Sequence, residues 1–378
     1  MKAIKNAVFI TSDGVIDDKI LLFDTHIVGF VDSLNKQDIE VIDAGGMYVS
    51  AGFIDIHIHG SGGADTMDAT FESIDTISKS IVANGTTSFL PTTMTMSIDS
   101  IKKALFNISK YKNSVLGANI LGVHMEGPFI SPLKAGAQNA SYIIPACMDL
   151  IDSYHDIIKM ITIAPEEGNN LQIIHQIHKK YPHIILSIGH SKASYTQCKE
   201  SFLHGISHVT HIFNAMDGYH HRDVGIIGAV FEDEHISCDI IADTIHTHTS
   251  TLELTHKLKP NNLILITDAM RAGCMIDGTY DLGGQKVIVQ DSKAILEDGT
   301  LAGSLLTQNK AVYNMLRYTS MSLVEAIGAV TFLPAQKLGV SKGDLVKGFD
   351  ADIVIFDKDI NIYKTFINGI VKYTNNLI

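Results

Sequence analysis

The feature that most constrains the fold is a series of short apolar runs separated by helix-like segments. Segments such as SIDTISKSIVANG and NLQIIHQIHKKYP repeat apolar residues at helical spacing. The runs are eight in number: FIDIHIHG (53–60), TSFLPTTM (87–94), ILGVHMEG (120–127), IKMITIAPE (158–166), IILSIGHS (184–191), HVTHIFNAM (208–216), ISCDIIADTIH (236–246) and LILITDAM (263–270). Strands that are buried on both faces read as such runs, so the pattern predicts an α/β fold in the form of a (β/α)8 TIM-like barrel. Because periodicity does not show closure, a doubly wound open sheet remains an alternative.

Nearly every run ends in a side chain that can bind a metal ion or move a proton. These side chains are His57 and His59, Thr92 and Thr93, His124 and Glu126, Glu166, His190, His211, Asp243 and His246, and Asp268. In a parallel barrel the carboxyl ends of all strands open on one face, and that face holds the active site. One arrangement therefore accounts for the whole series.

Several of these groups have an ordinary explanation when they are taken singly. His57 and His59 lie on the same side of a strand, where they can share a metal ion or form a hydrogen-bonded core pair. His190 and His211 close successive runs and can also share an ion. A buried Asp268 needs a charge partner, which a metal ion supplies. At the strand ends of one barrel, the groups together favour a metal site.

The two ends of the sequence carry a different pattern. KAIKNAVFIT and KILLFDTHIVGFV near the start, and DADIVIFDKDINIYKTFINGIVKY near the end, place short apolar stretches between turns rich in Gly, Asp and Asn. We expect these stretches to pair into one small β-sandwich domain, residues 1–50 plus 343–378. The barrel domain, residues 51–342, would then be inserted between its two halves.

Composition excludes several classes of protein. The chain of 378 residues is 46% apolar, which is ample for a large core. No apolar run reaches the roughly 18 residues that span a bilayer, and the first residues lack the apolar stretch of a signal peptide, so no membrane partner is expected. A net charge of −12 without a basic patch argues against a nucleic-acid partner. The four cysteines form no CxxC pair, which fits a reducing cytoplasmic location.

Several segments carry a specific family resemblance. AGFIDIHIHG, HMEGPFISP, GHS, THIFNAM and TDA, in this order and spacing, resemble the amidohydrolase superfamily. Within it, HMEGPF, HIFNAM and LAGS are similar to the N-acetylglucosamine-6-phosphate deacetylase family, and the likeness covers essentially the whole chain. The resemblance implies that Glu126, His190 and His211 bind a divalent metal ion and that Asp268 is the catalytic carboxylate. Zinc is expected, with iron, cobalt and manganese as alternatives.

The resemblance also implies a second metal position and a set of substrate contacts. Some family members bind a second ion through the pair that corresponds to His57 and His59, so one or two ions per chain are expected. The positions that match contacts with a phosphorylated amino sugar are Ala137, Gln138, Asn214, Ala215, Arg222, His246, Leu301, Ala302 and Gly303. Arg222 and His246 would contact the phosphate and the sugar, because a guanidinium donates two parallel hydrogen bonds to a phosphate.

Two positions depart from the family pattern. The family loop HHREPG reads HHRDVG (220–225) in this chain, which changes the segment that presents Arg222. A histidine that polarises the amide carbonyl in many members is replaced by Gln138. The glutamine amide can still donate a hydrogen bond to an oxyanion, but it carries no charge.

These roles imply hydrolysis of the acetamide of N-acetylglucosamine 6-phosphate to acetate and glucosamine 6-phosphate. Deacetylation of the galacto epimer, N-acetylgalactosamine 6-phosphate, is an alternative, because a single side chain can read one inverted hydroxyl. A cyclic-amide hydrolase of the dihydroorotase or hydantoinase type is another, although Glu126 stands where such enzymes usually carry a modified lysine. The non-enzyme alternative is a silent sugar-phosphate-binding barrel, which predicts the loss of a metal ligand or of Asp268. A homodimer is expected from the resemblance alone.

Overall fold

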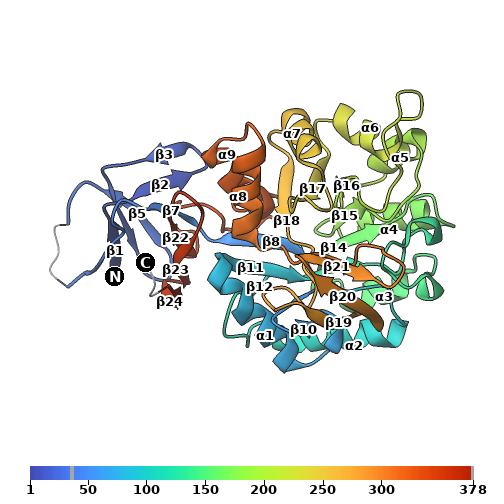
Figure 1. Ribbon diagram of the computed structural model, residues 1–378, viewed down its shortest axis with the longest axis horizontal. Coiled ribbons are helices and arrows are strands. Elements are labelled where there is room, and N and C mark those ends of the chain that lie inside the picture. The colour runs from blue at the N-terminus through green and yellow to red at the C-terminus, as the bar shows by residue number, and fades with distance from the viewer. Residues whose placement is uncertain (35–37, 376–378) are drawn as a thin grey trace.

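The computed structural model describes residues 1–34 and 38–375 and contains two parts (Figure 1). The larger part holds parallel strands surrounded by helices, and the smaller part holds strands from both ends of the sequence. No helix in these two residue ranges is both long and apolar enough to cross a membrane.

The larger part is built on two parallel sheets, with strand orders β12-β11-β8 and β13-β14-β15-β16-β17-β18. Their strands are β8 (Phe53–Ile58), β11 (Thr86–Pro91), β12 (Asn119–Ile120), β13 (Val123–Glu126), β14 (Ile158–Ile163), β15 (Ile185–Ile188), β16 (Ile206–Val209), β17 (Ser237–Ile241) and β18 (Leu263–Ile266). Each predicted apolar run overlaps one of these strands. The prediction of parallel α/β architecture is therefore confirmed.

Backbone contacts join the two parallel sheets along both edges, between β11 and β13 and between β18 and β8. Thr92, just after β11, forms a parallel bridge with His124 of β13, and the neighbouring Thr93 N–H donates to the His124 carbonyl at 3.0 Å. At the other end, the Asp268 N–H donates to the His57 carbonyl at 2.9 Å, where β18 lies against β8. The sheets therefore curl, so that side chains at their carboxyl ends face a common centre.

Helices cover the outside of the curled sheets (Figure 1). They are α1 (Phe71–Ile81), α2 (Ile98–Tyr111), α3 (Met148–Tyr154), α4 (Asn170–Lys180), α5 (Tyr195–Leu203), α6 (Gly225–Glu232), α7 (Thr249–Leu258), α8 (Gln308–Tyr318), α9 (Leu323–Gly328) and α10 (Phe332–Leu338). In α1, Ile74, Ile77 and Ile81 recur at helical spacing and are buried in the core, while Thr70 caps the helix through the Ser73 N–H. The predicted helical segments 73–85 and 170–182 overlap α1 and α4.

Shorter elements connect these helices and strands. They are the 3₁₀ turns η1 (Thr66–Asp68), η2 (Val82–Asn84), η3 (Pro132–Lys134) and η4 (Ala140–Tyr142), and the two-residue strands β9 (Gly60–Ser61) and β10 (Ala64–Asp65). An antiparallel sheet of β19 (Gly278–Leu282), β20 (Gln285–Gln290) and β21 (Lys293–Leu296) follows β18. Sequence analysis did not predict this sheet, which adds Leu282 to the wall of the central cavity.

The smaller part contains two sheets, with strand orders β5-β4-β1-β6 and β24-β23-β22-β7-β2-β3. Their strands are β1 (Lys2–Lys5), β2 (Val8–Thr11), β3 (Gly14–Ile16), β4 (Ile20–Phe23), β5 (Ile27–Val31), β6 (Glu40–Asp43), β7 (Tyr48–Ala51), β22 (Ile353–Phe356), β23 (Ile362–Ile367) and β24 (Ile370–Thr374). The predicted pairing between the two ends of the sequence is present, because β7 pairs with β22 in antiparallel register.

Strand β22 contributes to two hydrophobic cores. Ile353 and Ile355 pack in the core of the terminal strands, whereas Val354 and Phe356 pack in the core of the larger part. All four side chains are fully buried. Successive side chains of a strand point to opposite faces, so this one strand joins the two parts of the molecule.

Candidate metal centre and catalytic cavity

Three predicted ligands converge at the carboxyl ends of β13, β15 and β16. The Glu126 Oε1 lies 3.0 Å from the His211 Nε2 and 3.3 Å from the His190 Nε2, and the two Nε2 atoms are 3.2 Å apart. All three side chains are buried. Sequence analysis placed these residues at one site, and the structure brings them together.

The hydrogen bonds of the two imidazole rings leave lone pairs facing that point. The Nδ1 of His190 lies 2.9 Å from the Lys134 carbonyl, and the Nδ1 of His211 lies 3.2 Å from the Asn214 carbonyl. A carbonyl oxygen only accepts, so each Nδ1 carries the proton and, in the neutral ring, each Nε2 carries a lone pair. Metal-binding histidines are usually oriented by such a bond from their other ring nitrogen.

The separations between the ligand atoms fit a divalent cation. Ligands at the Zn–N distance of about 2.0–2.1 Å stand about 3.3–3.4 Å apart at tetrahedral angles. The three separations of 3.0, 3.2 and 3.3 Å are close to that edge. Two nitrogen lone pairs and a carboxylate oxygen at this spacing repel one another unless protons or a cation lie between them. The donor set therefore fits a metal ion.

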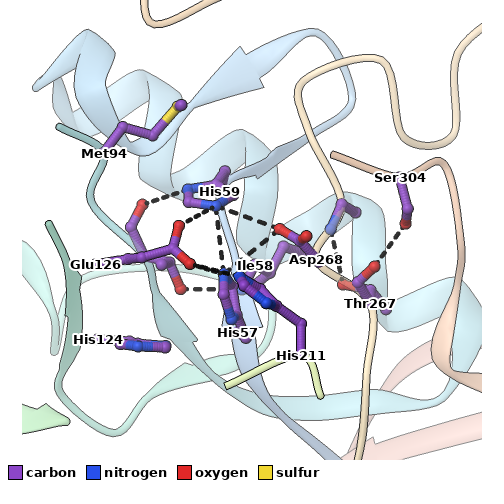
Figure 2. A network of polar contacts seen from close by, with 12 residues as sticks. His57, Ile58, His59, Met94, His124, Glu126, His211, Thr267, Asp268 and Ser304 are labelled. Carbon is purple, nitrogen blue, oxygen red and sulfur yellow. Dashed lines mark hydrogen bonds and ion pairs between the residues drawn. The ribbon is translucent and has the colours of Figure 1, made fainter. Parts of the chain in front are cut away.

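A second group shares Glu126. The Nε2 atoms of His57 and His59 are 3.3 Å apart, and the His59 Nε2 lies 3.2 Å from the Glu126 Oε2. Both nitrogens approach the Asp268 Oδ1, at 3.4 and 3.3 Å (Figure 2). The His59 Nδ1 lies 3.2 Å from the Thr92 carbonyl, but the His57 Nδ1 has no hydrogen-bond partner among the described residues. This second group is therefore compatible with a cation but is less completely oriented than the first.

The charges of the site stabilise one another. Burial alone would raise the pKa of Glu126, but His57 and His190 hold that pKa well below its usual range. Burial also opposes the charge of Asp268, and His57 and His59 lower its pKa to about 2. Conversely, Asp268 and Glu126 raise the pKa of His59 well above its ordinary value despite burial. A metal ion must displace the protons of such histidines, so metal binding should release protons.

The turns that follow the strands aim the site residues. The φ values are 47° for His190, 32° for His211 and 48° for Asp268. This left-handed region is uncommon for residues other than glycine and is kept where surrounding contacts over-determine it. The Asp268 carbonyl accepts the Ser304 N–H at 2.8 Å, and the His190 carbonyl accepts the Ser131 N–H at 2.8 Å.

A cavity of about 240 Å³ opens above the ligands. Its walls include Glu126, His190, His211 and Asp268, and also His59 from the second group. The predicted substrate-contact residues that line it are Ala137, Gln138, Asn214, Ala215, His246, Leu301 and Gly303. Sequence analysis missed Met94, Gly136, Leu282 and Thr300, which also line the cavity and lie outside the segments that resemble the family.

Gln138 has both ends of its amide engaged. Its Nε2 donates to the Glu126 Oε2 at 2.8 Å, and its Oε1 accepts the Thr95 N–H at 2.7 Å. The side chain is buried and lines the cavity. In this arrangement Gln138 orients the Glu126 carboxylate, a contact that sequence analysis did not anticipate.

Two predicted substrate contacts lie away from the cavity surface. Ala302 is fully buried beneath the cavity wall, between two residues that do line it. Arg222 is exposed, and its Nη1 lies 2.7 Å from the His221 Nε2. Within one chain, therefore, the structure does not bring Arg222 to the predicted site.

Other strand-end residues have supporting contacts. The His246 Nδ1 lies 2.6 Å from the Asp243 Oδ2, and Asp243 also accepts the His246 N–H at 2.8 Å, so the carboxylate fixes the ring that lines the cavity. Glu166 accepts the Ser191 hydroxyl at 2.7 Å and lies outside the cavity lining. The His124 Nε2 lies 2.7 Å from the Thr162 hydroxyl, and both side chains are buried.

Comparisons with known proteins agree with this geometry. The sequence profile described as the Amidohydrolase family matches residues 48–371. A protein of Lysinibacillus sphaericus named N-acetylglucosamine-6-phosphate deacetylase is 39% identical over 360 residues, covering 93% of this chain and 92% of that protein. The crystal structure of N-acetylglucosamine-6-phosphate deacetylase from Pasteurella multocida superposes with a TM-score of 0.93 at 30% identity, over 99% of this chain and 100% of the other. A Mycobacterium smegmatis mutant deacetylase in complex with N-acetyl-D-glucosamine-6-phosphate has a TM-score of 0.92 at 25% identity and covers 99% of each chain.

Proposed function

This chain belongs to the amidohydrolase family, and we propose that it is the enzyme that hydrolyses N-acetylglucosamine 6-phosphate to acetate and glucosamine 6-phosphate. The observation that carries the proposal is the placement of Asp268 and of the Glu126, His190 and His211 cluster in one cavity. The similar proteins described above are named as deacetylases of this sugar phosphate, and the similarity covers nearly the full length of the chain.

The residues have defined roles in this proposal. A divalent ion held by Glu126, His190 and His211 would polarise the acetamide carbonyl and lower the pKa of a water bound to it. We propose zinc as that ion, with iron, cobalt or manganese as alternatives, and a second ion at His57 and His59 as optional. Gln138 orients Glu126 through the 2.8 Å bond.

Asp268 acts as the general base and then as the general acid in this proposal. Its low pKa keeps the carboxylate ionised, so that it accepts a proton from the attacking water. The same carboxylate then donates that proton to the departing amine, because its side chain reaches the cavity from the end of β18. His57 and His59 hold it in place from one side.

The remaining cavity residues would bind the sugar and its phosphate. His246, which Asp243 fixes in place, is a donor for the sugar phosphate, and Asn214, Ala215 and Ala137 shape the wall beside the ligands. Leu301 and Gly303 also line the cavity. Because Arg222 lies outside the cavity of a single chain, its phosphate contact is proposed only as part of a homodimer.

We also propose a closed barrel, a β-sandwich formed by the two ends of the chain, and a cytoplasmic location. The bonds that join the two parallel sheets at both ends support a closed (β/α)8 barrel in residues 51–342. The two terminal sheets, which share one core, support a β-sandwich in residues 1–50 plus 343–378; residues 35–37 and 376–378 of that domain lie outside the described residues. Free Cys147, Cys198, Cys238 and Cys274 are compatible with a cytoplasmic location.

The test is acetate release from three sugars by the purified protein. N-acetylglucosamine 6-phosphate, N-acetylgalactosamine 6-phosphate and unphosphorylated N-acetylglucosamine are each assayed before chelation, after chelation and after metal is restored. We expect metal-dependent release that is fastest with the first sugar. Faster release from the galacto epimer would make that epimer the proposed substrate. Faster release from the unphosphorylated sugar would contradict the proposed contacts with the phosphate. No release from any of the three would refute the proposal.

A further inference from the structure

We propose that Asp239 and His208, two buried residues without a role in the reaction above, form a positioning pair that aims the metal ligand His211. This inference rests on the proposed metal site of Glu126, His190 and His211. The inference concerns the contacts that hold His211 in place. Neither Asp239 nor His208 lines the cavity. Both side chains are fully buried.

Asp239 holds the backbone of the ligand from the neighbouring strand. One oxygen of its carboxylate, Oδ1, accepts the main-chain N–H of His211 in a short hydrogen bond. Its main-chain carbonyl accepts the N–H of the next residue, Ile212, at 2.9 Å. A single residue of β17 thus fixes two consecutive N–H groups of the segment that carries the ligand.

The hydrogen bond between His211 and Asp239 lies just beyond the last paired residues of β16 and β17. Strands β16 and β17 pair only at His208↔Ser237 and Val209↔Cys238. Beyond that pairing, His211 has a φ of 32°, and Phe213 and Ala215 also have positive φ values. A residue other than glycine is strained in this region, and a buried N–H without a partner is costly. The carboxylate satisfies the His211 N–H where no strand neighbour does, and so stabilises the turn that directs the imidazole at Glu126.

His208 fixes the carboxylate in turn. Its Nε2 lies 2.9 Å from the Asp239 Oδ2, and its Nδ1 lies 2.7 Å from the Ser237 Oγ. Burial lowers the pKa of His208 even though Asp239 opposes that shift. In the neutral ring, Nε2 donates to Asp239 while Nδ1 accepts the Ser237 hydroxyl, so the orientation of the carboxylate is set from both sides.

The test compares Asp239→Ala and Asp239→Asn with a matched control, Asp352→Ala. Asp352 is a buried carboxylate with the same kinds of partner, a base at 2.7 Å (Lys342 Nζ) and a main-chain N–H at 2.8 Å (Asn368), but it lies beside the terminal strands. Each protein is loaded with Co²⁺, and the affinity is measured by chelator competition. The visible absorption spectrum of the bound Co²⁺ reports the ligand geometry, and kcat and KM are measured on the same samples.

We expect Asp239→Ala to bind Co²⁺ about 10–100-fold more weakly, with an altered spectrum and a lower kcat at similar KM. Asp239→Asn should stay near the unaltered protein, because its amide oxygen still accepts the His211 N–H and its NH₂ can donate to the other tautomer of His208. Asp352→Ala should lower the melting temperature and leave the Co²⁺ spectrum unchanged. If Asp239→Ala does not fold, His208→Ala, which removes the group that orients the carboxylate, should show the altered spectrum.

Three results would overturn the inference. An unchanged affinity and spectrum in folded Asp239→Ala, or in His208→Ala if that variant is needed, would show that the pair does not aim His211. An Asp239→Asn variant as impaired as Asp239→Ala would mean that charge, rather than the hydrogen bond to His211, is what matters. Equal impairment in Asp352→Ala would indicate general destabilisation. If the unaltered protein bound no Co²⁺, the proposed function and this inference would fail together, whereas binding that Asp239→Ala leaves unchanged overturns the inference alone.

Discussion

Replacing Asp268 by Asn tests the proton transfer proposed for this site. Asparagine has nearly the same shape and tolerates the φ of 48° found at this position, so the variant should fold. Its amide cannot accept the proton of a water and pass it on. Loss of a positioned general base and acid lowers kcat by about 10²–10⁴-fold. A loss of that size corresponds to about 3–5.5 kcal/mol of transition-state stabilisation.

The geometry also predicts what the substitution leaves intact. Asp268 contacts His57 and His59 at 3.4 and 3.3 Å and is not part of the Glu126, His190 and His211 cluster. The variant should therefore keep the metal ion of that cluster while losing turnover, even if an ion at the His57 and His59 pair binds more weakly.

Acetate release and metal content by inductively coupled plasma mass spectrometry are measured on the same preparation, with Asp352→Asn as a control for the loss of a buried carboxylate away from the cavity. A variant that retains its metal and keeps a near-normal kcat would refute the proton-transfer role. Loss of the cluster's metal together with activity would instead place Asp268 among the ligands of the primary ion.

Three further predictions concern metal, charge and packing. Glu126→Gln removes the carboxylate shared by both ligand groups and should lose most bound metal; full metal content by mass spectrometry would contradict the site. Burial lowers the pKa of Lys337 from 10.5 to about 8, so the unfolded chain binds more protons between these values and stability should rise with pH there, by at most about 3 kcal/mol. Lys337→Met should flatten that rise in urea unfolding, and an unchanged slope would contradict it. Val354→Ala and Ile355→Ala remove fully buried side chains from the two different cores, so each should lower the free energy of unfolding by about 1–4 kcal/mol, and a loss confined to one variant would show that β22 supports one core only.

The parallel strands and the positions of the proposed metal ligands are predictable because their signals are local. Buried parallel strands leave continuous apolar runs, and the side chain that follows such a run lies at the carboxyl edge of the sheet. Glu126, His190, His211 and Asp268 each lie at the end of a run, so the pattern places them at one edge of the sheet. Their spacing of 3.0–3.3 Å, by contrast, depends on turns with positive φ that no short stretch of sequence specifies.

Other features depend on contacts between distant segments. The sheet of β19, β20 and β21 is an exception with a local signal, because QKVIVQ in β20 holds a Val-Ile-Val stretch that is typical of a strand and that sequence analysis did not use. Gln138 was matched to a residue that touches substrate, yet its amide is held by Thr95 and directed at Glu126, across a turn whose shape the sequence does not reveal. The family resemblance places Arg222 at the phosphate, whereas its exposed position is a property of the folded loop.

The pairing of β7 with β22 has a consequence for how the chain matures on the ribosome. Ser50 and Val354 are register partners although nearly the whole chain separates them. When β7 leaves the ribosome, its parallel neighbour β2 has already been synthesised. Its other neighbour, β22, has not. During that interval one edge of β7 stays open to pairing with other chains. Truncated or stalled nascent chains that end before β22 should therefore be the species most prone to aggregate.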